Sequence, residues 1–331
     1  MNKLQFIHNE EKKSKTIRFF FPLYPLKTLK IPYFMCVIAA LIALRVVFQF
    51  FSISIPQFNM ALSLAHTPII IAGWLFGPVF GLIFGAFTDT LMFLIRPAAA
   101  WFWLYAIQEP LLCMMSGIIG SIYVLRLNAK NNLIDLVVLK IIAIGFLIAT
   151  YVFVLIYAVP GVPMQGGSKF DALFYSTYKY VALGALLIFI VTFEGFFWFF
   201  RRKKQNKNNM VLYLSTIAFL NAIIFSFLLG TISAIEYFKF LNNGIESPFF
   251  TRYGMMFYTL PRIIKESIKT PIQIIVLIGV IYAINPMFKN SLNNVRLIYL
   301  SKENYQLEIQ RKNNNIPPYN SDNCGILKYY L

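Results

Sequence analysis

Eight long apolar runs dominate the hydrophobic pattern of the chain, and short polar stretches separate them. A transmembrane helix needs about 20 mainly apolar residues, each adding about 1.5 Å of rise. The runs that meet or approach this length are residues 33–51, 60–76, 79–95, 101–125, 133–158, 180–200, 211–235 and 260–284. Each must be helical, because hydrocarbon offers no water to satisfy strand edges or open loops. The pattern therefore predicts an all-α fold, a polytopic bundle of transmembrane helices.

The stretches between the runs are polar or rich in turn-forming residues. Gly77 and Pro78 form a tight turn between the second and third runs, and residues 128–132 are a polar linker. Residues 1–32 are basic, with no small-residue cleavage site after the first short apolar stretch, so we expect an uncleaved cytoplasmic or interfacial segment. Residues 287–331 are polar and rich in asparagine, which predicts a cytoplasmic tail.

Composition and charge agree with this membrane interpretation. Hydrophobic residues make up 58% of the chain and charged residues only 13%, against about 25% charged in soluble domains. The net charge of +17 is spread unevenly between the two sides of the predicted bundle: alternate connections hold twenty Lys and Arg against five in the others. The positive-inside rule then places both termini in the cytoplasm of a multi-pass cell-membrane protein. The positive charge is a topology signal rather than a sign of nucleic-acid binding.

The motifs of common enzyme classes are missing from the sequence. It contains no GxxxxGK[ST] phosphate loop, no HExxH, no GxSxG and no Cys/His cluster. Cys36 and Cys113 lie inside apolar runs and are expected to act as small hydrophobic residues. We therefore expect no catalytic residues, no metal and no cofactor.

Charged residues inside apolar runs are the main candidates for function, because burying them in a membrane is expensive. Arg45 lies near the middle of the first run, and Gln49 follows one turn later; both are candidate ligand contacts. A structural role for Arg45, bound to a carbonyl or to Asp89, is the alternative. Ala39 and Ala43 form a small-xxx-small pair on another face of the same helix. That pair permits close approach of a partner helix, either of another subunit or of this chain.

The third run carries a repeated GxxxG pattern at Gly77, Gly81 and Gly85. Such a stripe predicts a close helix crossing. Asp89 and Arg96 follow seven residues apart on one face. They are expected either to pair with each other or to receive a ligand.

Aromatic residues gather at the start of the fourth run, at Trp101, Trp103 and Tyr105. They are typical of an interfacial belt at the membrane surface. A stacking wall for a flat heteroaromatic ligand is the sharper alternative. In that case Gln108 and Glu109 supply the polar contacts that orient the ligand.

The eighth run begins with a polar face on an otherwise apolar helix. Arg262, Lys265 or Glu266, and Lys269 are spaced by three or four residues and therefore share one side of the helix. A basic stripe in the outer half of the membrane suits an anionic ligand that enters from outside. Snorkelling of these side chains to lipid headgroups is the alternative.

Two segments resemble the substrate-binding S component of energy-coupling-factor (ECF) vitamin transporters, folate-type family. They are HTPIIIAGWLFGPVFGLIFGAFTD at residues 66–89 and PRIIKESIKTPI at residues 261–272. The resemblance covers roughly residues 33–126 and 211–286. It implies a six-helix core, with residues 133–200 forming two inserted helices.

The resemblance also implies a function. S components bind a vitamin and associate with a coupling membrane protein and two ATPase subunits, which would hydrolyse ATP in place of this chain. By position, Ala39 and Ala43 would dock the coupling protein, while Arg45, Arg262 and Lys265 would contact the ligand. A stand-alone secondary transporter or channel and a structural membrane protein are the alternatives.

Overall fold

The computed structural model describes residues 19–21, 32–55, 60–95, 100–126, 132–156, 169–201 and 205–313. The chain divides into two units, residues 1–284 and 285–331, and every contact discussed below lies in the first. The principal elements, in chain order, are α2 (Pro32–Phe50), β1 (Ile53–Ile55), β2 (Met60–Leu62), α3 (His66–Phe76), α4 (Pro78–Ile95), α5 (Trp103–Ala106), α6 (Gln108–Arg126), α7 (Asn132–Ile156), α8 (Lys169–Arg201), α9 (Gln205–Leu220), the π-helix η3 (Asn221–Leu229), α10 (Gly230–Leu241), α11 (Pro248–Tyr253) and α12 (Met256–Asn313).

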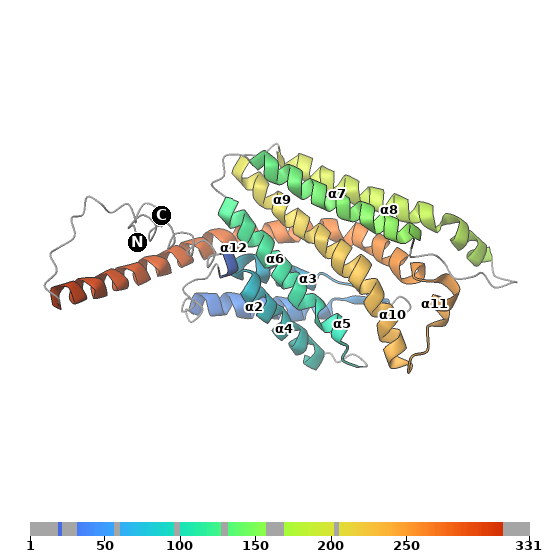
Figure 1. Ribbon diagram of the computed structural model, residues 1–331, viewed down its shortest axis with the longest axis horizontal. Helices are drawn as coiled ribbons and strands as arrows, with labels where there is room; N and C mark the ends of the chain where they lie inside the picture. The colour runs from blue at the N-terminus through green and yellow to red at the C-terminus, as the bar shows by residue number, and fades with distance from the viewer. Residues whose placement is uncertain are drawn as a thin grey trace, which may run out of the picture. The chain divides into compact units, whose positions relative to one another are not determined.

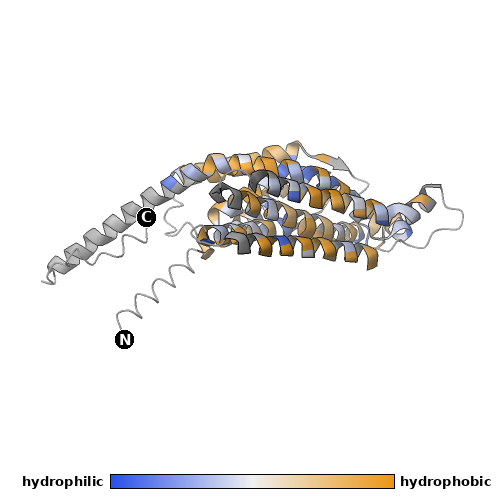
Figure 2. Ribbon diagram, turned by 90° about the horizontal axis from the view of Figure 1, so that it is seen from above, coloured by the Kyte–Doolittle hydropathy of each residue, from blue (hydrophilic) through white to orange (hydrophobic). Residues whose placement is uncertain are grey.

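Six helical segments in the described part of the chain are long and apolar enough to cross a membrane. They are Pro32–Phe50, Pro78–Ile95, Trp103–Arg126, Ser176–Gly195, Met210–Leu241 and Met256–Ile284. Hydrophobic residues predominate along these helices (Figure 2). The prediction of a polytopic helical membrane bundle is thus confirmed. The second expected span is reduced to a shorter apolar helix, His66–Phe76. The fifth is matched by α7, Asn132–Ile156, a helix of 25 residues that contains the apolar stretch Val137–Val152.

The second expected span is replaced by a short hairpin and a short helix. β1 and β2 pair antiparallel, with Ile53 opposite Leu62 and Ile55 opposite Met60. β-Branched Ile53 and Ile55 favour a strand, and Pro56 disfavours helix in the residue before it. The eleven residues of α3 rise only about 16 Å, roughly half of the hydrocarbon thickness. Pro68 does not interrupt α3, because it lies in the first turn.

A long central segment, made of α9, η3 and α10, organises the first unit. In Met210–Leu241 83% of the residues in the most apolar window are buried, against 17% in α2. α6 packs on one side of it, and α7 and α8 pack beside α9 (Figure 1). The sequence indicated this segment only as residues 211–235. The described helix is longer and changes to π-helical winding at its middle.

The glycine stripe of α4 packs against α6, as its spacing predicted. A Cβ atom at Gly81 would lie 2.8 Å from the carbonyl oxygen of Cys113, and one at Gly117 would lie 2.5 Å from Pro78 N. Real side chains cannot occupy such positions, so the backbones meet only because these residues are glycine. Gly77 turns the chain between α3 and α4 with a φ of 89°, which also favours glycine.

Two other boundaries differ from the sequence prediction. α8 begins at Lys169, in a stretch expected to be a loop. The polar residues after 286, expected as a tail, are helical as far as Asn313, and the second unit begins at residue 285. The division into a six-helix core and two inserted helices stays a prediction.

Candidate functional site

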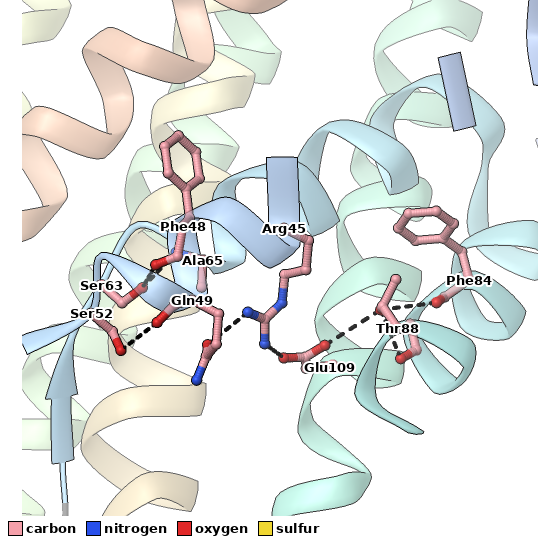
Figure 3. Close-up of polar contacts among 10 residues, drawn as sticks. Arg45, Phe48, Gln49, Ser52, Ser63, Ala65, Phe84, Thr88 and Glu109 are labelled. Carbon is pink, nitrogen blue, oxygen red and sulfur yellow. Dashed lines mark hydrogen bonds and ion pairs between the residues drawn. The ribbon is translucent and has the colours of Figure 1, made fainter. Parts of the chain in front are cut away.

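A buried ion pair joins α2 to α6 (Figure 3). Arg45 and Glu109 are 5% and 7% exposed, and the Arg45 guanidinium donates through Nη2 to Oε1 of Glu109. Its Nη1 donates to Oε1 of Gln49, one turn further along α2, at 2.8 Å. The hydroxyl of Thr88 on α4 lies 3.4 Å from the second carboxylate oxygen of Glu109. This polar cluster therefore connects α2, α4 and α6.

Gly85 sets the position of Glu109. A Cβ atom at Gly85 would lie 2.7 Å from the Glu109 carbonyl oxygen and 2.6 Å from Pro110 Cα. Because there is no side chain at this point, α4 can lie directly on the first turn of α6. The glycine stripe thus allows the Glu109 carboxylate to reach Arg45 between closely packed helices.

The partner of Arg45 is therefore Glu109, and not Asp89 or a carbonyl as the sequence suggested. Glu109 itself was considered as a ligand contact only in the alternative in which the aromatic residues form a stacking wall. Asp89 is half-buried and close enough to Arg45 and Glu109 to interact with both electrostatically. Arg96, the other expected partner of Asp89, lies outside the described residues. A ligand contact by Arg45 or Gln49 stays a prediction.

A second polar cluster runs along one face of α12. We call it the α12 stripe: Arg262, Lys265, Glu266, Lys269 and Gln273. The Glu266 carboxylate is 0% exposed. Its Oε1 atom forms ion pairs with Lys269 Nζ at 2.8 Å and with Lys265 Nζ at 3.2 Å. Arg262 is also buried and donates through Nη1 to the Tyr258 carbonyl oxygen at 2.8 Å. Three cations and one carboxylate leave this buried stripe with a formal charge of +2.

Electrostatic interactions link the α12 stripe to the rest of the site. His66, the first residue of α3, is within reach of the charges of Lys269, Glu266 and Arg45. Tyr105 on α5 is close enough to Arg262 to interact with its charge electrostatically. Gly230 makes room for Arg262, because a Cβ atom there would lie 3.3 Å from the Arg262 Nε atom. His66 on α3 therefore lies near charged residues of both clusters.

The aromatic residues of the fourth run separate into two groups. Trp101 and Trp103 are 56% and 58% exposed and lie on the outside of the bundle. Tyr105 instead packs edge-on against Tyr237, with ring centroids 5.5 Å apart. Gln108 donates through Nε2 to the Ser233 hydroxyl at 2.8 Å. Of the expected stacking residues, only Tyr105 is placed beside the α12 stripe.

Ala39 and Ala43 lie on the outward face of α2. Both are exposed, as are Met35 and Val47 one turn before and one turn after them. Arg45 points to the opposite, buried side of the helix, as the 100° spacing of helical residues predicted. Among the described residues, the small-residue pair therefore contacts no helix closely enough to be buried, and it is open to a lipid or a partner.

Sequence reasoning missed two buried amides, Asn221 and Gln273. Gln273 had a signal, because it continues the α12 stripe four residues after Lys269. Asn221 had none beyond being a polar residue in a long apolar run. Among the described residues, no group of three His, Cys, Asp or Glu side chains is arranged to hold a metal ion.

Fold and site together define a class: a multi-pass helical membrane protein with clusters of buried charged side chains. Residues 33–199 match the family of ECF transporter substrate-specific components. The chain belongs to this family, whose members are transport subunits rather than enzymes and associate with ECF membrane and ATPase modules. The match includes residues 133–199, the helices that the sequence analysis placed outside the core.

Two relatives cover nearly the same length. An uncharacterized protein of Mycoplasma genitalium is 34% identical over 84% of this chain and 98% of its own length. Its homologue in Mycoplasma pneumoniae, also uncharacterized, is 32% identical over 83% of this chain and 95% of its own length. No solved structure matches the chain.

Proposed function

We propose that this protein is the high-affinity substrate-binding subunit of an ATP-driven ECF vitamin importer, and that its substrate is folate or a closely related anionic B vitamin. The observation that carries the proposal is the buried excess of positive charge on the α12 stripe. The family match supports the role of a substrate-specific subunit.

Buried charge is the physical argument for an anionic substrate. An ion transferred to a low-dielectric interior loses several kcal/mol of solvation, and only part of this is regained in pairing. Glu266 is shared by Lys265 and Lys269, so one carboxylate serves two cations, and Arg262 lies one turn away. A bound carboxylate or phosphate would balance the formal charge of +2 and form charge-assisted hydrogen bonds of about 1.5–3 kcal/mol each.

Folate has the two kinds of group that this interior suits. Its glutamate carboxylates would bind the cations of the α12 stripe. Its flat pteridine ring would stack on an aromatic side chain, for which Tyr105 is the best-placed residue beside Arg262. The predicted topology, with both termini cytoplasmic, opens this end of α12 to the outer face.

The transport step belongs to the partners in this proposal. The outward stripe that contains Ala39 and Ala43 would dock the coupling membrane protein, because small residues allow helices to approach closely. Two ATPase subunits would supply the hydrolysis for which this chain has no phosphate loop. The role of this chain is to capture the vitamin and present it.

Equilibrium binding of folate to the purified full-length protein tests the substrate. We expect Arg262→Gln and Lys265→Gln to weaken folate binding about tenfold or more, since each removes one charge-assisted contact. Lys140→Gln is the matched control, because Lys140 pairs with Glu194 between α7 and α8, away from the stripe. Wild-type protein that does not bind folate, or variants that bind it equally well, would refute the proposal.

Docking has a separate test. Ala39→Trp combined with Ala43→Trp should abolish folate uptake in cells while leaving folate binding by the purified protein unchanged. Ala86→Trp, at an exposed small residue of α4, is the control and should preserve both. Loss of binding in the double variant, or uptake by the isolated protein in proteoliposomes without ATPases, would contradict the assignment.

A further inference from the structure

Two fully buried amide side chains lie in the middle of the bundle without hydrogen-bond partners. Asn221 is 1% exposed and Gln273 is 0% exposed. Within the part of the chain that the structure describes, neither the oxygen nor the nitrogen of either amide has a partner. Each such atom is unfavourable, because burial removes its hydrogen bonds to water and no protein group replaces them. Buried polar groups are normally paired, so these four atoms need an explanation.

The two amides lie on neighbouring antiparallel helices. The Thr259 hydroxyl of α12 lies 3.4 Å from the Thr231 hydroxyl of α10, and Arg262 lies against Gly230. Because the helices are antiparallel, moving from Gly230 back to Asn221 corresponds to moving from Arg262 forward along α12. Asn221 therefore lies at the level of the segment around Lys269. That level is four residues, or roughly 6 Å, from Gln273.

The π-helical winding of η3 determines which way Asn221 faces. η3 begins at Asn221 and ends immediately before Gly230. A π-helix has more than four residues per turn, so these nine residues make about two turns and return to the same face. In an α-helix nine residues make about two and a half turns, and Asn221 would face away. Asn221 therefore shares the face on which Gly230 meets Arg262.

Gln273 lies on the same polar face of α12. It follows Lys269 by four residues and Glu266 by seven, so its side chain continues the α12 stripe. The stripe thus changes from cationic at Arg262 to neutral at Gln273. The rise between these two residues is about 16 Å, and that between Lys269 and Gln273 is about 6 Å.

We propose that Asn221 and Gln273 bind the uncharged hydrogen-bonding edge of a two-part ligand whose anionic groups lie at Arg262, Lys265 and Lys269. Each amide offers an N–H donor and a carbonyl acceptor, which complements a ligand edge with an adjacent acceptor and donor, such as a lactam or an aminopyrimidinone. A compact anion cannot occupy both ends of the stripe. The assignment rests on the proposed function and deepens it.

Two probes separate the two ends of the site. Folate carries both the glutamate and the pteridine edge, whereas p-aminobenzoylglutamate carries the same glutamate without the pteridine ring. We expect Asn221→Leu and Gln273→Met to weaken folate binding about tenfold or more and to leave p-aminobenzoylglutamate binding unchanged. Lys265→Gln should weaken both. Thermal unfolding of the ligand-free variants should occur at or above the wild-type temperature, because both substitutions remove unpaired polar atoms.

Ser121→Ala is the matched control. Ser121 of α6 is also buried with an unpartnered hydroxyl, and its loss should change the binding of neither probe. Unchanged folate binding in both amide variants overturns the assignment. So does equal weakening for both probes, or lower thermal stability with unchanged binding, which would make the amides a bond between helices. Wild-type protein that binds neither probe refutes the proposed function instead.

Discussion

The ion pair between Arg45 and Glu109 gives the sharpest test of how the interior is held together. Glu109→Leu removes the carboxylate, so the buried Arg45 cation loses its partner. Arg45→Met removes the cation and leaves the carboxylate buried. Breaking a buried pair by removing one partner costs about 3–5 kcal/mol, and both residues are almost fully buried. We expect each single variant to lose that much free energy of unfolding.

The double variant Arg45→Met/Glu109→Leu should behave differently. Replacing a buried ion pair by apolar residues of similar volume is often neutral or stabilising. The double variant should therefore be more stable than either single variant, and the coupling free energy should be about 3 kcal/mol or more. Lys140→Met with Glu194→Leu is the control. That pair is less buried, with 44% of the Glu194 side chain exposed, so its coupling should be smaller than that of Arg45 and Glu109.

Reversible unfolding of the purified variants in mixed micelles measures these free energies. Effects of Arg45→Met and Glu109→Leu that add within about 0.5 kcal/mol would refute the reasoning, because independent sites behave in that way. Folate binding by the double variant then decides between the two roles of Arg45. Wild-type affinity assigns Arg45 to holding α2 against α6, whereas an affinity about tenfold lower or worse assigns it to the ligand.

Three further outcomes follow from packing and topology. Gly85→Leu should prevent accumulation of folded protein in membranes, because its Cβ would lie 2.6–2.7 Å from the backbone of α6. Gly145→Leu is the control and should accumulate normally, because a Cβ there has nothing within 4 Å. Equal yields of the two variants would contradict the packing argument. In a variant with the third cysteine replaced, a membrane-permeant maleimide should label exposed Cys36 and spare buried Cys113 until the protein is unfolded. Tags at both termini should be accessible only from the cytoplasmic side, and labelling of either from outside would contradict the charge pattern.

Much of the bundle was predictable from the order of apolar and polar residues along the sequence. Long apolar runs have few structures open to them in hydrocarbon, so the helical membrane fold followed directly from the sequence. Periodicity within a helix was equally reliable, because the angle between residues is set by helical geometry. It placed Arg45 opposite Ala39 and Ala43 and collected the cations of α12 on one face. The glycine spacing of α4 likewise indicated a close crossing.

Partners distant in sequence were decided only by tertiary structure. Arg45 pairs with Glu109, 64 residues away, because Gly85 lets α4 and α6 come close enough, and no local pattern contains that information. The second apolar run is too short to cross once its first residues pair as a strand. The π-helical winding of η3, which changes the direction in which Asn221 faces, is likewise not contained in the spacing of residues along the sequence. Spacing in the sequence determines which residues share a helix face, whereas contacts between helices determine what that face meets.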